Sequence, residues 1–242
     1  MRPYDPARPL VFIHIPKTAG TSVQHVFRSW FGDGLRLHYF DEIRGMPPGR
    51  DPAFDRHGAD SPVCVYGHFN RNRNFGVEVN YPDATQFVTI LRDPFETACS
   101  NYYFLKRVGA HWKDRSRIPR GDLESYLSDT PPNILNHFPA VLTPDNYRDI
   151  LREHFVGIGL TERLPETLAR IAGQIGRRFA PSTLGQLNQS PREERPAAGM
   201  AGLRASYAAR HLLEFEVYDY ARNLLDETAA PSFHMAGPAQ RK

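Results

Sequence analysis

The chain has 242 residues, of which 40% are hydrophobic and 24% are charged, and its formal net charge is +3. This length suits one α/β domain with decorations, and the composition predicts a packed core. The small charge excess argues against general nucleic-acid binding and is compatible with an enzyme that has local positive sites for anionic ligands. We expect a single domain over residues 1–228 and a disordered tail at 229–242.

The cysteines and the N-terminal segment give an indication of the cellular compartment. Cys64 and Cys99 lie in apolar surroundings without zinc-like spacing, which predicts reduced core thiols. The polar residues 1–9 and the short apolar run behind them match neither a signal peptide nor a membrane span. The expected protein is soluble and cytoplasmic.

Hydrophobic periodicity predicts strands that alternate with helices along the chain. The expected strands are the short apolar runs at 10–15, 35–39, 63–66, 87–91 and 155–160. The expected helices begin near Thr21 and continue with segments at about 95–107, 121–129, 133–141, 145–154, 161–179 and 203–226. Such alternation is typical of an α/β fold of three layers, with a mostly parallel central sheet and helices on both faces.

The first predicted strand passes through Pro16 into a tight loop, Lys17–Ser22, which opens the first helix. Backbone N–H groups at a helix start point towards such a loop, and the helix dipole favours negative charge there. Lys17, Thr21 and Ser22 add a cation and two hydroxyl donors. The unit therefore predicts a phosphate site and a P-loop-like fold, although an ordinary strand-to-helix turn with a polar N-cap is the alternative.

The loop departs from the Walker A pattern G-x-x-x-x-G-K-[ST] of many ATP-binding proteins. When Gly20 is aligned with the second glycine, Thr21 takes the place of the lysine and Ile15 that of the first glycine. The lysine of this chain stands earlier, at Lys17. A P-loop kinase or nucleotidase is the alternative enzyme, and a nucleotide-binding module without turnover is the third interpretation.

The run Ile15–Ser22 strongly resembles the 5′-phosphosulfate loop of sulfotransferases that use 3′-phosphoadenosine 5′-phosphosulfate (PAPS). It is most similar to the carbohydrate branch, which includes heparan-sulfate 2-O-sulfotransferases and small bacterial enzymes. The resemblance implies that Lys17 is catalytic and contacts the oxygen between sulfate and phosphate. It also implies nucleotide contacts from the whole loop, namely Lys17, Thr18, Ala19, Gly20, Thr21 and Ser22.

A second candidate group follows the strand at 87–91. Arg92 stands at the carboxyl end of this strand, where open parallel sheets place their ligands, and Ser100 lies about two turns into the next helix. A guanidinium and a hydroxyl can hold a phosphate, although an Arg92–Asp93 pair that fixes the strand end is the alternative. The run from Arg92 to Tyr103 resembles the family's 3′-phosphate motif. Two separated phosphate sites suit PAPS better than ATP.

Two weaker matches extend the resemblance to roughly residues 10–226. The run 156–163 resembles the last core strand and helix start of the family. The run 187–192 resembles the segment that closes over the nucleotide, which implies cofactor contacts from Asn188 and Ser190.

The acceptor hydroxyl must lose a proton, and His68 is the predicted base. It follows the strand at 63–66 and Gly67, which places it at the mouth of the sheet on the cofactor side. A structural edge histidine is the alternative. The segment resembles the one that carries the catalytic histidine of the 2-O branch, with Tyr66 in place of the first residue of its His-Gly-His pattern. Asp93 and Glu96 are fallback bases, and His14 is expected to be structural.

These residues predict in-line transfer of the sulfuryl group of PAPS to an acceptor hydroxyl, which the resemblance places on a glycan or glycoconjugate. No metal is expected, because a sulfuryl group carries less charge than a phosphoryl group and needs only lysine and amides. No nucleic-acid partner and no membrane span are expected. Arg71, Arg73 and the basic run 106–120, with His111 and Trp112, predict a collar for an anionic acceptor; a solvated basic surface is the alternative.

Overall fold

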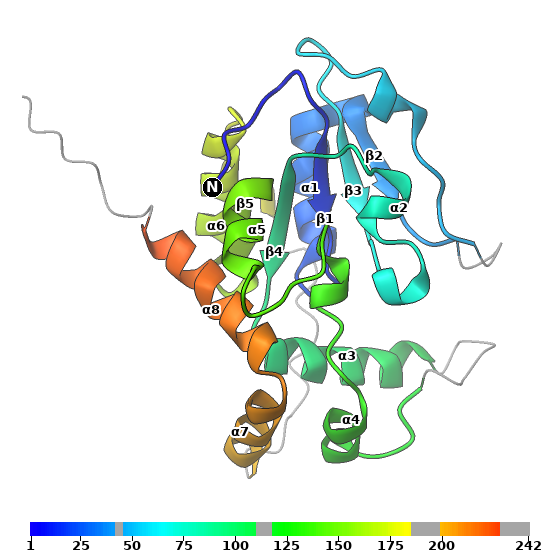
Figure 1. Cartoon of the computed structure of the whole chain (residues 1–242), viewed down its shortest axis with the longest axis vertical. Helices are drawn as coiled ribbons and strands as arrows, with labels where there is room; N and C mark the ends of the chain where they lie inside the picture. Colours follow the sequence, from blue (N-terminus) through cyan, green and yellow to red (C-terminus); the bar gives the residue numbers. More distant parts are fainter. Residues whose placement is uncertain (42–45, 110–117, 185–198, 228–242) are drawn as a thin grey trace, which may run out of the picture.

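Five short apolar segments form the centre of the fold, in a computed structural model that describes residues 1–41, 46–109, 118–184 and 199–227. They are the strands Leu10–Ile13 (β1), Leu35–His38 (β2), Cys64–Gly67 (β3), Phe87–Leu91 (β4) and Phe155–Leu160 (β5). All four neighbouring pairs run parallel, in the order β2-β3-β1-β4-β5 (Figure 1). The predicted parallel sheet is confirmed.

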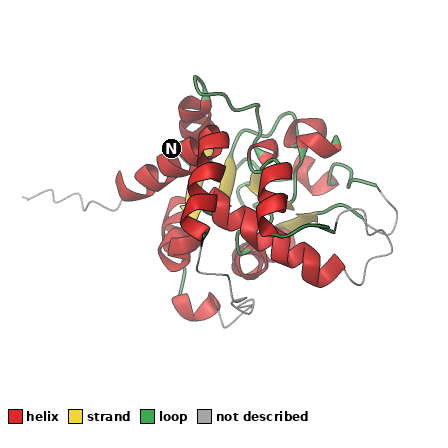
Figure 2. Cartoon of the chain, turned by 90° about the horizontal axis from the view of Figure 1, so that it is seen from below, coloured by secondary structure: helices red, strands yellow, loops and turns green. Residues whose placement is uncertain are grey.

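The helices of the described part of the chain cover both faces and the lower edge of this sheet (Figures 1 and 2). They are Gly20–Phe31 (α1), Val77–Asn80 (α2), Pro94–Gly109 (α3), Leu123–Asp129 (α4), Tyr147–His154 (α5), Leu164–Gln174 (α6), Met200–Arg210 (α7) and Leu212–Glu227 (α8). Among these helices, none is long and apolar enough to cross a bilayer.

Side-chain alternation along the strands divides the core into two layers. Val11 and Ile13 of β1 face a cluster that includes side chains of α2, α5 and α8. Leu10 and Phe12 face the opposite cluster, which includes side chains of α1 and α6. The fold is therefore the predicted three-layer α/β arrangement. Cys64 lies in the second cluster, and both cysteines are buried and reduced, as expected.

The helices α3, α4 and α7 form a smaller apolar cluster of their own at the carboxyl edge of the sheet (Figure 1). Their contact is reinforced by Arg204 of α7, whose guanidinium binds both carboxylate oxygens of Asp93 at the start of α3. Asp93 Oδ1 also accepts a hydrogen bond from the backbone N–H of Glu96, at 3.0 Å, and so caps α3. One aspartate thus fixes both the beginning of α3 and the position of α7.

Three predicted helices differ from those observed. The segment at 133–141 forms only a 3-10 turn, Leu135–His137, because Pro139 prevents helix continuation. The helix expected at 161–179 begins with a 3-10 turn and ends at Gln174, just before Gly176 adopts a positive φ of 66°. The final helix is divided at His211, since α7 packs against α3 and α4 whereas α8 packs against β5.

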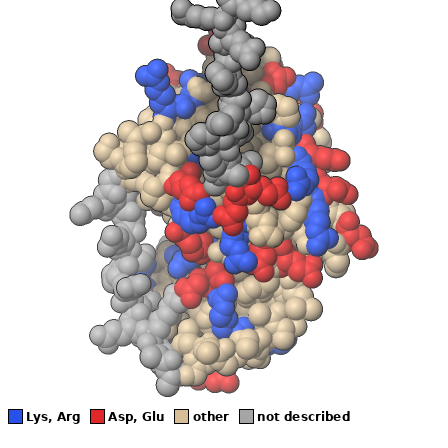
Figure 3. Space-filling model, turned by 90° about the vertical axis from the view of Figure 1, so that its left-hand side faces the viewer, with Lys and Arg blue, Asp and Glu red and all other residues tan. Residues whose placement is uncertain are grey.

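Arginines of neighbouring elements hold α8 against the sheet. Arg170 of α6 donates hydrogen bonds to the carbonyl groups of Leu224 and Leu225 at 2.8 and 2.7 Å, which satisfies acceptors near the helix end. Arg163 forms an ion pair with Asp226. Figure 3 shows basic and acidic side chains interspersed on this face. Among the described residues in and around α8, Arg152, Arg163 and Arg222 each form an ion pair with a carboxylate.

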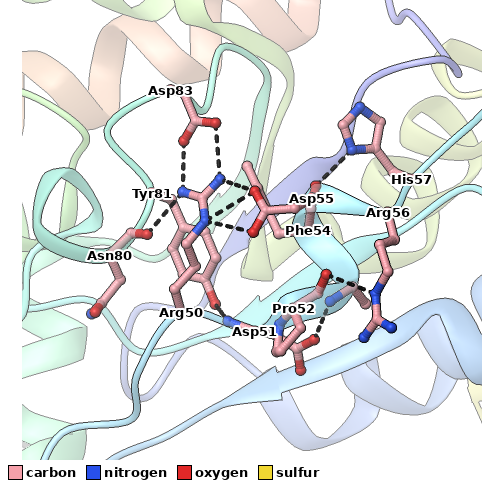
Figure 4. Close-up of polar contacts among 11 residues, drawn as sticks. Arg50, Asp51, Pro52, Phe54, Asp55, Arg56, His57, Asn80, Tyr81 and Asp83 are labelled. Atoms are coloured by element: carbon pink, nitrogen blue, oxygen red, sulfur yellow. Dashed lines mark hydrogen bonds and ion pairs between the residues drawn. The ribbon is translucent and has the colours of Figure 1, made fainter.

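A group of ion pairs and hydrogen bonds, shown in Figure 4, stabilises the connection between β2 and β3. The Arg50 guanidinium binds the carboxylates of Asp55 and Asp83, with shortest distances of 2.5 and 2.7 Å. Nearby, the Tyr81 hydroxyl lies 3.2 Å from His38 Nδ1, in a buried hydrogen bond at the end of β2. These contacts hold the carboxyl end of β2 in place. The expected tail at 229–242 lies outside the described residues.

Candidate active site

Three of the predicted groups meet at the carboxyl edge of the sheet. The central strand β1 lies between β3 and β4, so the segments that follow these three parallel strands are neighbours. They carry the loop 16–19, His68 and Arg92. The chain leaves β1 towards β2 and β3 on one side and later adds β4 and β5 on the other. This is the kind of switch point at which open α/β sheets bind ligands.

The loop after β1 has a backbone suited to an anion. Lys17 and Ala19 adopt left-handed conformations, with φ of 72° and 61°, which are costly for residues other than glycine and concentrate at functional sites. Thr18 is buried and its hydroxyl donates to the Ile15 carbonyl oxygen at 2.8 Å. Alternating left-handed residues of this kind form amide-lined concavities that bind phosphate.

The start of α1 leaves amide groups available to such an anion. The helix begins at Gly20, and the first N–H groups of any helix have no acceptor within it. Ala19, the residue before the helix, has a methyl side chain and cannot cap these amides. Thr21 is exposed on the first turn, whereas Ser22 is buried. For the predicted nucleotide contacts of this loop, the structure thus shows a suitable backbone more clearly than suitable side chains.

Gly20 is required by a close approach of His14. A Cβ atom on Gly20 would lie 1.6 Å from Nε2 of the His14 ring, so any side chain there would displace the imidazole. The buried Tyr66 hydroxyl also donates to the Gly20 carbonyl oxygen at 2.8 Å. Tyr66 therefore holds the first residue of α1, directly after the loop, in position.

Lys17 and Arg92 lie on the side of the loop that faces β4 and α3. The Lys17 ammonium is 4.0 Å from the ring centroid of Phe104 in α3, a cation–π contact that directs the side chain across this edge. Arg92 donates a hydrogen bond to the Lys17 carbonyl oxygen at 3.3 Å and forms a long ion pair with Glu96, at 3.7 Å. Ser100 is half-buried further along α3.

His68 is oriented by the backbone of His14. Its Nδ1 lies 2.6 Å from the His14 carbonyl oxygen, which can only accept, so the proton is on Nδ1 and the lone pair is on Nε2. Burial lowers the pKa of His68; the bond to the His14 carbonyl opposes this shift, and the positive charge of Arg73 adds to it. The ring is therefore neutral near pH 7, the state that a general base requires.

Three side chains that the sequence did not single out as functional surround His68. The His14 ring stacks on it at 4.3 Å, the Tyr39 ring meets it edge-on at 4.8 Å, and the His137 ring lies at 6.4 Å. His14 was expected inside the first strand, but β1 ends at Ile13 and the His14 ring is half-buried beside the loop. Nothing in the local sequence pattern distinguishes these three residues.

Several other predicted residues have partners elsewhere or lie outside the described part of the chain. Asp93, a fallback base, has both carboxylate oxygens bound by Arg204, and Oδ1 also accepts from a backbone amide. Arg71 is bound to Glu78 and to a backbone carbonyl, whereas the Arg73 guanidinium lies 4.3 Å above the ring of Phe40. Other predicted residues lie outside the described part of the chain: Asn188, Ser190, and residues 110–117 of the basic run 106–120, which include His111 and Trp112.

The chain was compared with known proteins by sequence and by structure. No family model matches the chain, and no curated protein sequence matches it. Among solved structures, the chain is similar to mouse sulfotransferase SULT7A1 complexed with PAP, with a TM-score of 0.44 and 13% sequence identity. The match covers 85% of this chain and 66% of that chain.

Proposed function

We propose that the chain is a sulfotransferase that moves the sulfuryl group of PAPS to a hydroxyl group of a carbohydrate. One observation carries the proposal. A neutral histidine with its lone pair on Nε2 lies next to the loop whose sequence resembles the phosphosulfate loop and whose Lys17 and Ala19 have positive φ. The carbohydrate acceptor rests on the sequence resemblance alone.

In this proposal the nucleotide spans the edge of the sheet from β1 to β4. The amides of the loop and of the first turn of α1 hold the 5′-phosphate, and the dipole of α1 favours its charge. Arg92 and Ser100 hold the 3′-phosphate at the end of β4. The contact between Arg92 and the Lys17 carbonyl supports this arrangement, because it joins the two phosphate sites directly. Asn188 and Ser190 are proposed to add contacts from the segment before α7.

The proposed transfer uses two side chains of this protein. The acceptor oxygen forms a bond to sulfur on the face opposite the bridging oxygen. The bond from sulfur to that oxygen breaks, and the electron pair leaves with the phosphate. The Lys17 ammonium stabilises the negative charge that develops on this oxygen. Because the ammonium is in position before the reaction begins, this is a preorganised electrostatic contribution. The acceptor proton passes to Nε2 of His68, and the loop holds the reactants in line.

The two proposed phosphate sites can be separated by nucleotide binding. We expect Arg92→Ala and Ser100→Ala to weaken the binding of the product nucleotide 3′-phosphoadenosine 5′-phosphate (PAP) by about tenfold or more. Binding of AMP, which lacks the 3′-phosphate, should change little. Isothermal titration calorimetry measures both affinities. Arg56→Ala is a matched control, since Arg56 is an exposed arginine bound to the Pro52 carbonyl, away from this edge. Equal losses for both nucleotides would assign Arg92 and Ser100 to the structure of the strand end.

The proposed reaction is tested by radioactive transfer. Incubation of the full chain with ³⁵S-labelled PAPS and a panel of glycans, phenols, lipids and small natural products should label a glycan. The labelled glycan should appear with an equal amount of PAP. Labelling confined to a phenol or a lipid would refute the carbohydrate acceptor and leave the sulfuryl transfer standing.

A further inference from the structure

We propose that His14 is a positioning residue that holds the His68 ring in its reactive orientation, and that Tyr39 fixes His14 for this task. The proposal rests on the proposed role of His68 as the base. It concerns two side chains that act through the His68 ring, and it assigns a reason for their presence at this edge of the sheet.

His14 contacts His68 in two independent ways. Its carbonyl oxygen binds His68 Nδ1 at 2.6 Å and so sets the tautomer. Its imidazole stacks on the His68 ring with centroids 4.3 Å apart and planes 25° apart, which sets the tilt of that ring. A hydrogen bond alone leaves the histidine free to rotate about the bonded nitrogen, and the stacked ring removes this freedom.

The same imidazole determines the distance between the phosphate loop and the base. His14 Nε2 occupies the space that a Cβ of Gly20 would need, while its ring face covers His68. The ring is thus placed between the first residue of α1 and the predicted base. Because both neighbours are in contact with one rigid ring, a shift of His14 would change the position of His68 relative to the loop.

Tyr39 holds the other side of this ring. Its hydroxyl lies 2.9 Å from His14 Nδ1, and its ring meets the His68 ring edge-on at 4.8 Å. Tyr39 directly follows β2. The last residue of β2, His38, forms a buried hydrogen bond with the Tyr81 hydroxyl. Burial raises the pKa of the Tyr39 hydroxyl, so it stays protonated. The edge strand therefore supports the His14 ring through a fixed hydrogen bond.

The groups around His68 are arranged so that its ring stays neutral. Burial lowers the pKa of His14 well below its ordinary value, and it lowers the pKa of His137 to about 3. Arg73 is the cation that disfavours protonation of His68, and Tyr39 is uncharged. Removal of the His14 ring would admit water to one face of His68. The loss of burial would raise the pKa of His68 towards its ordinary value of about 6.5.

Nuclear magnetic resonance titration of the His68 ring tests this proposal in the full chain without any nucleotide. Histidine labelled at ¹³Cε1 reports each ring, and His68→Asn identifies the His68 signal. His14→Asn removes the stacked ring but retains the backbone carbonyl and an amide that can bind Tyr39. Tyr39→Phe retains the aromatic contact but loses the hydroxyl. His25→Asn, at an exposed position of α1, is the matched control.

We expect the pKa of His68 to rise in His14→Asn, to rise less in Tyr39→Phe, and to stay unchanged in His25→Asn. In the transfer assay, kcat of His14→Asn should fall by about 10- to 100-fold, the size expected when a reacting group is displaced by about 1 Å. The affinity for PAP should stay close to that of the wild type.

An unchanged His68 titration in His14→Asn would overturn the proposal. If His14→Asn fails to fold, Tyr39→Phe decides in the same way: a raised pKa supports the proposal and an unchanged pKa overturns it. A wild-type protein that transfers no sulfuryl group would refute the proposed function instead. The titration needs no turnover, so the two failures are distinguishable.

Discussion

Replacement of Lys17 by alanine is expected to lower kcat by about 10²–10³-fold, the usual cost of removing one preorganised electrostatic stabiliser. The Lys17 ammonium lies across the edge of the sheet above the ring of Phe104, on the side of the loop towards Arg92. No other loop side chain in 16–22 carries a positive charge. The substitution leaves the buried Thr18 in place, so the melting temperature should change little. Initial rates with labelled PAPS and a thermal melt measure the two quantities.

Arg28→Ala is the matched control for this prediction. Arg28 is an exposed arginine in the last turn of α1, at the end of the helix away from the loop, so its removal changes the net charge of the protein equally. The kcat of this variant should remain within about twofold of the wild type, since surface charges act weakly on groups that they do not contact. Full turnover in Lys17→Ala, or an equal loss in Arg28→Ala, would remove Lys17 from the proposed mechanism.

His68→Asn should lower kcat by about 10²–10⁴-fold, the usual contribution of a general base. Asparagine can still donate to the His14 carbonyl, so the local hydrogen bond is retained while the proton acceptor is lost. PAP affinity, measured by calorimetry, should change little, because the loop and Arg92 remain intact. His25→Asn again serves as the control. Wild-type turnover in His68→Asn would show that the base is elsewhere.

The pH profile of kcat/KM tests the protonation state of His68 independently. Burial lowers the pKa of His68 below about 6.5, so its neutral, reactive form persists into mildly acidic solution. As the pH falls through the lowered pKa, His68 gains a proton and kcat/KM should decline. The midpoint of this acidic limb should lie below 6.5, and the limb should disappear in His68→Asn. An acidic midpoint above 6.5 would contradict the neutral, buried environment.

The sequence predicts the sheet well because its strands are continuous apolar runs with clear ends. The bounds of β4 and β5 agree with the prediction, since Arg92 and Thr161 interrupt buried runs directly after them. The bounds of the helices near the C-terminus were predicted less well. The break at His211 arises from the packing of α7 on α3 and of α8 on β5, a long-range effect that local periodicity does not contain.

The candidate site was predictable where it depends on strand ends. The loop after β1, His68 and Arg92 each follow a buried strand, and parallel strands bring such residues to one edge. The surroundings of His68 depend instead on the order of the strands. Tyr39 reaches the His14 ring because β2 and β1 both lie next to β3. The sequence alone does not predict this strand order or the register of the three strands. For the same reason, the bond from Tyr66 to the loop could not be foreseen.

The central claim is that the edge of the sheet binds a nucleotide with a 3′-phosphate and a 5′-phosphosulfate. Calorimetric titration of the full chain with PAP, AMP and ATP, each with and without Mg²⁺, tests it most directly. PAP should bind without Mg²⁺ and about tenfold or more tightly than AMP, because a charge-assisted hydrogen bond contributes about 1.5–3 kcal/mol. Tighter binding of ATP with Mg²⁺ than of PAP, or no binding of PAP, would contradict the account.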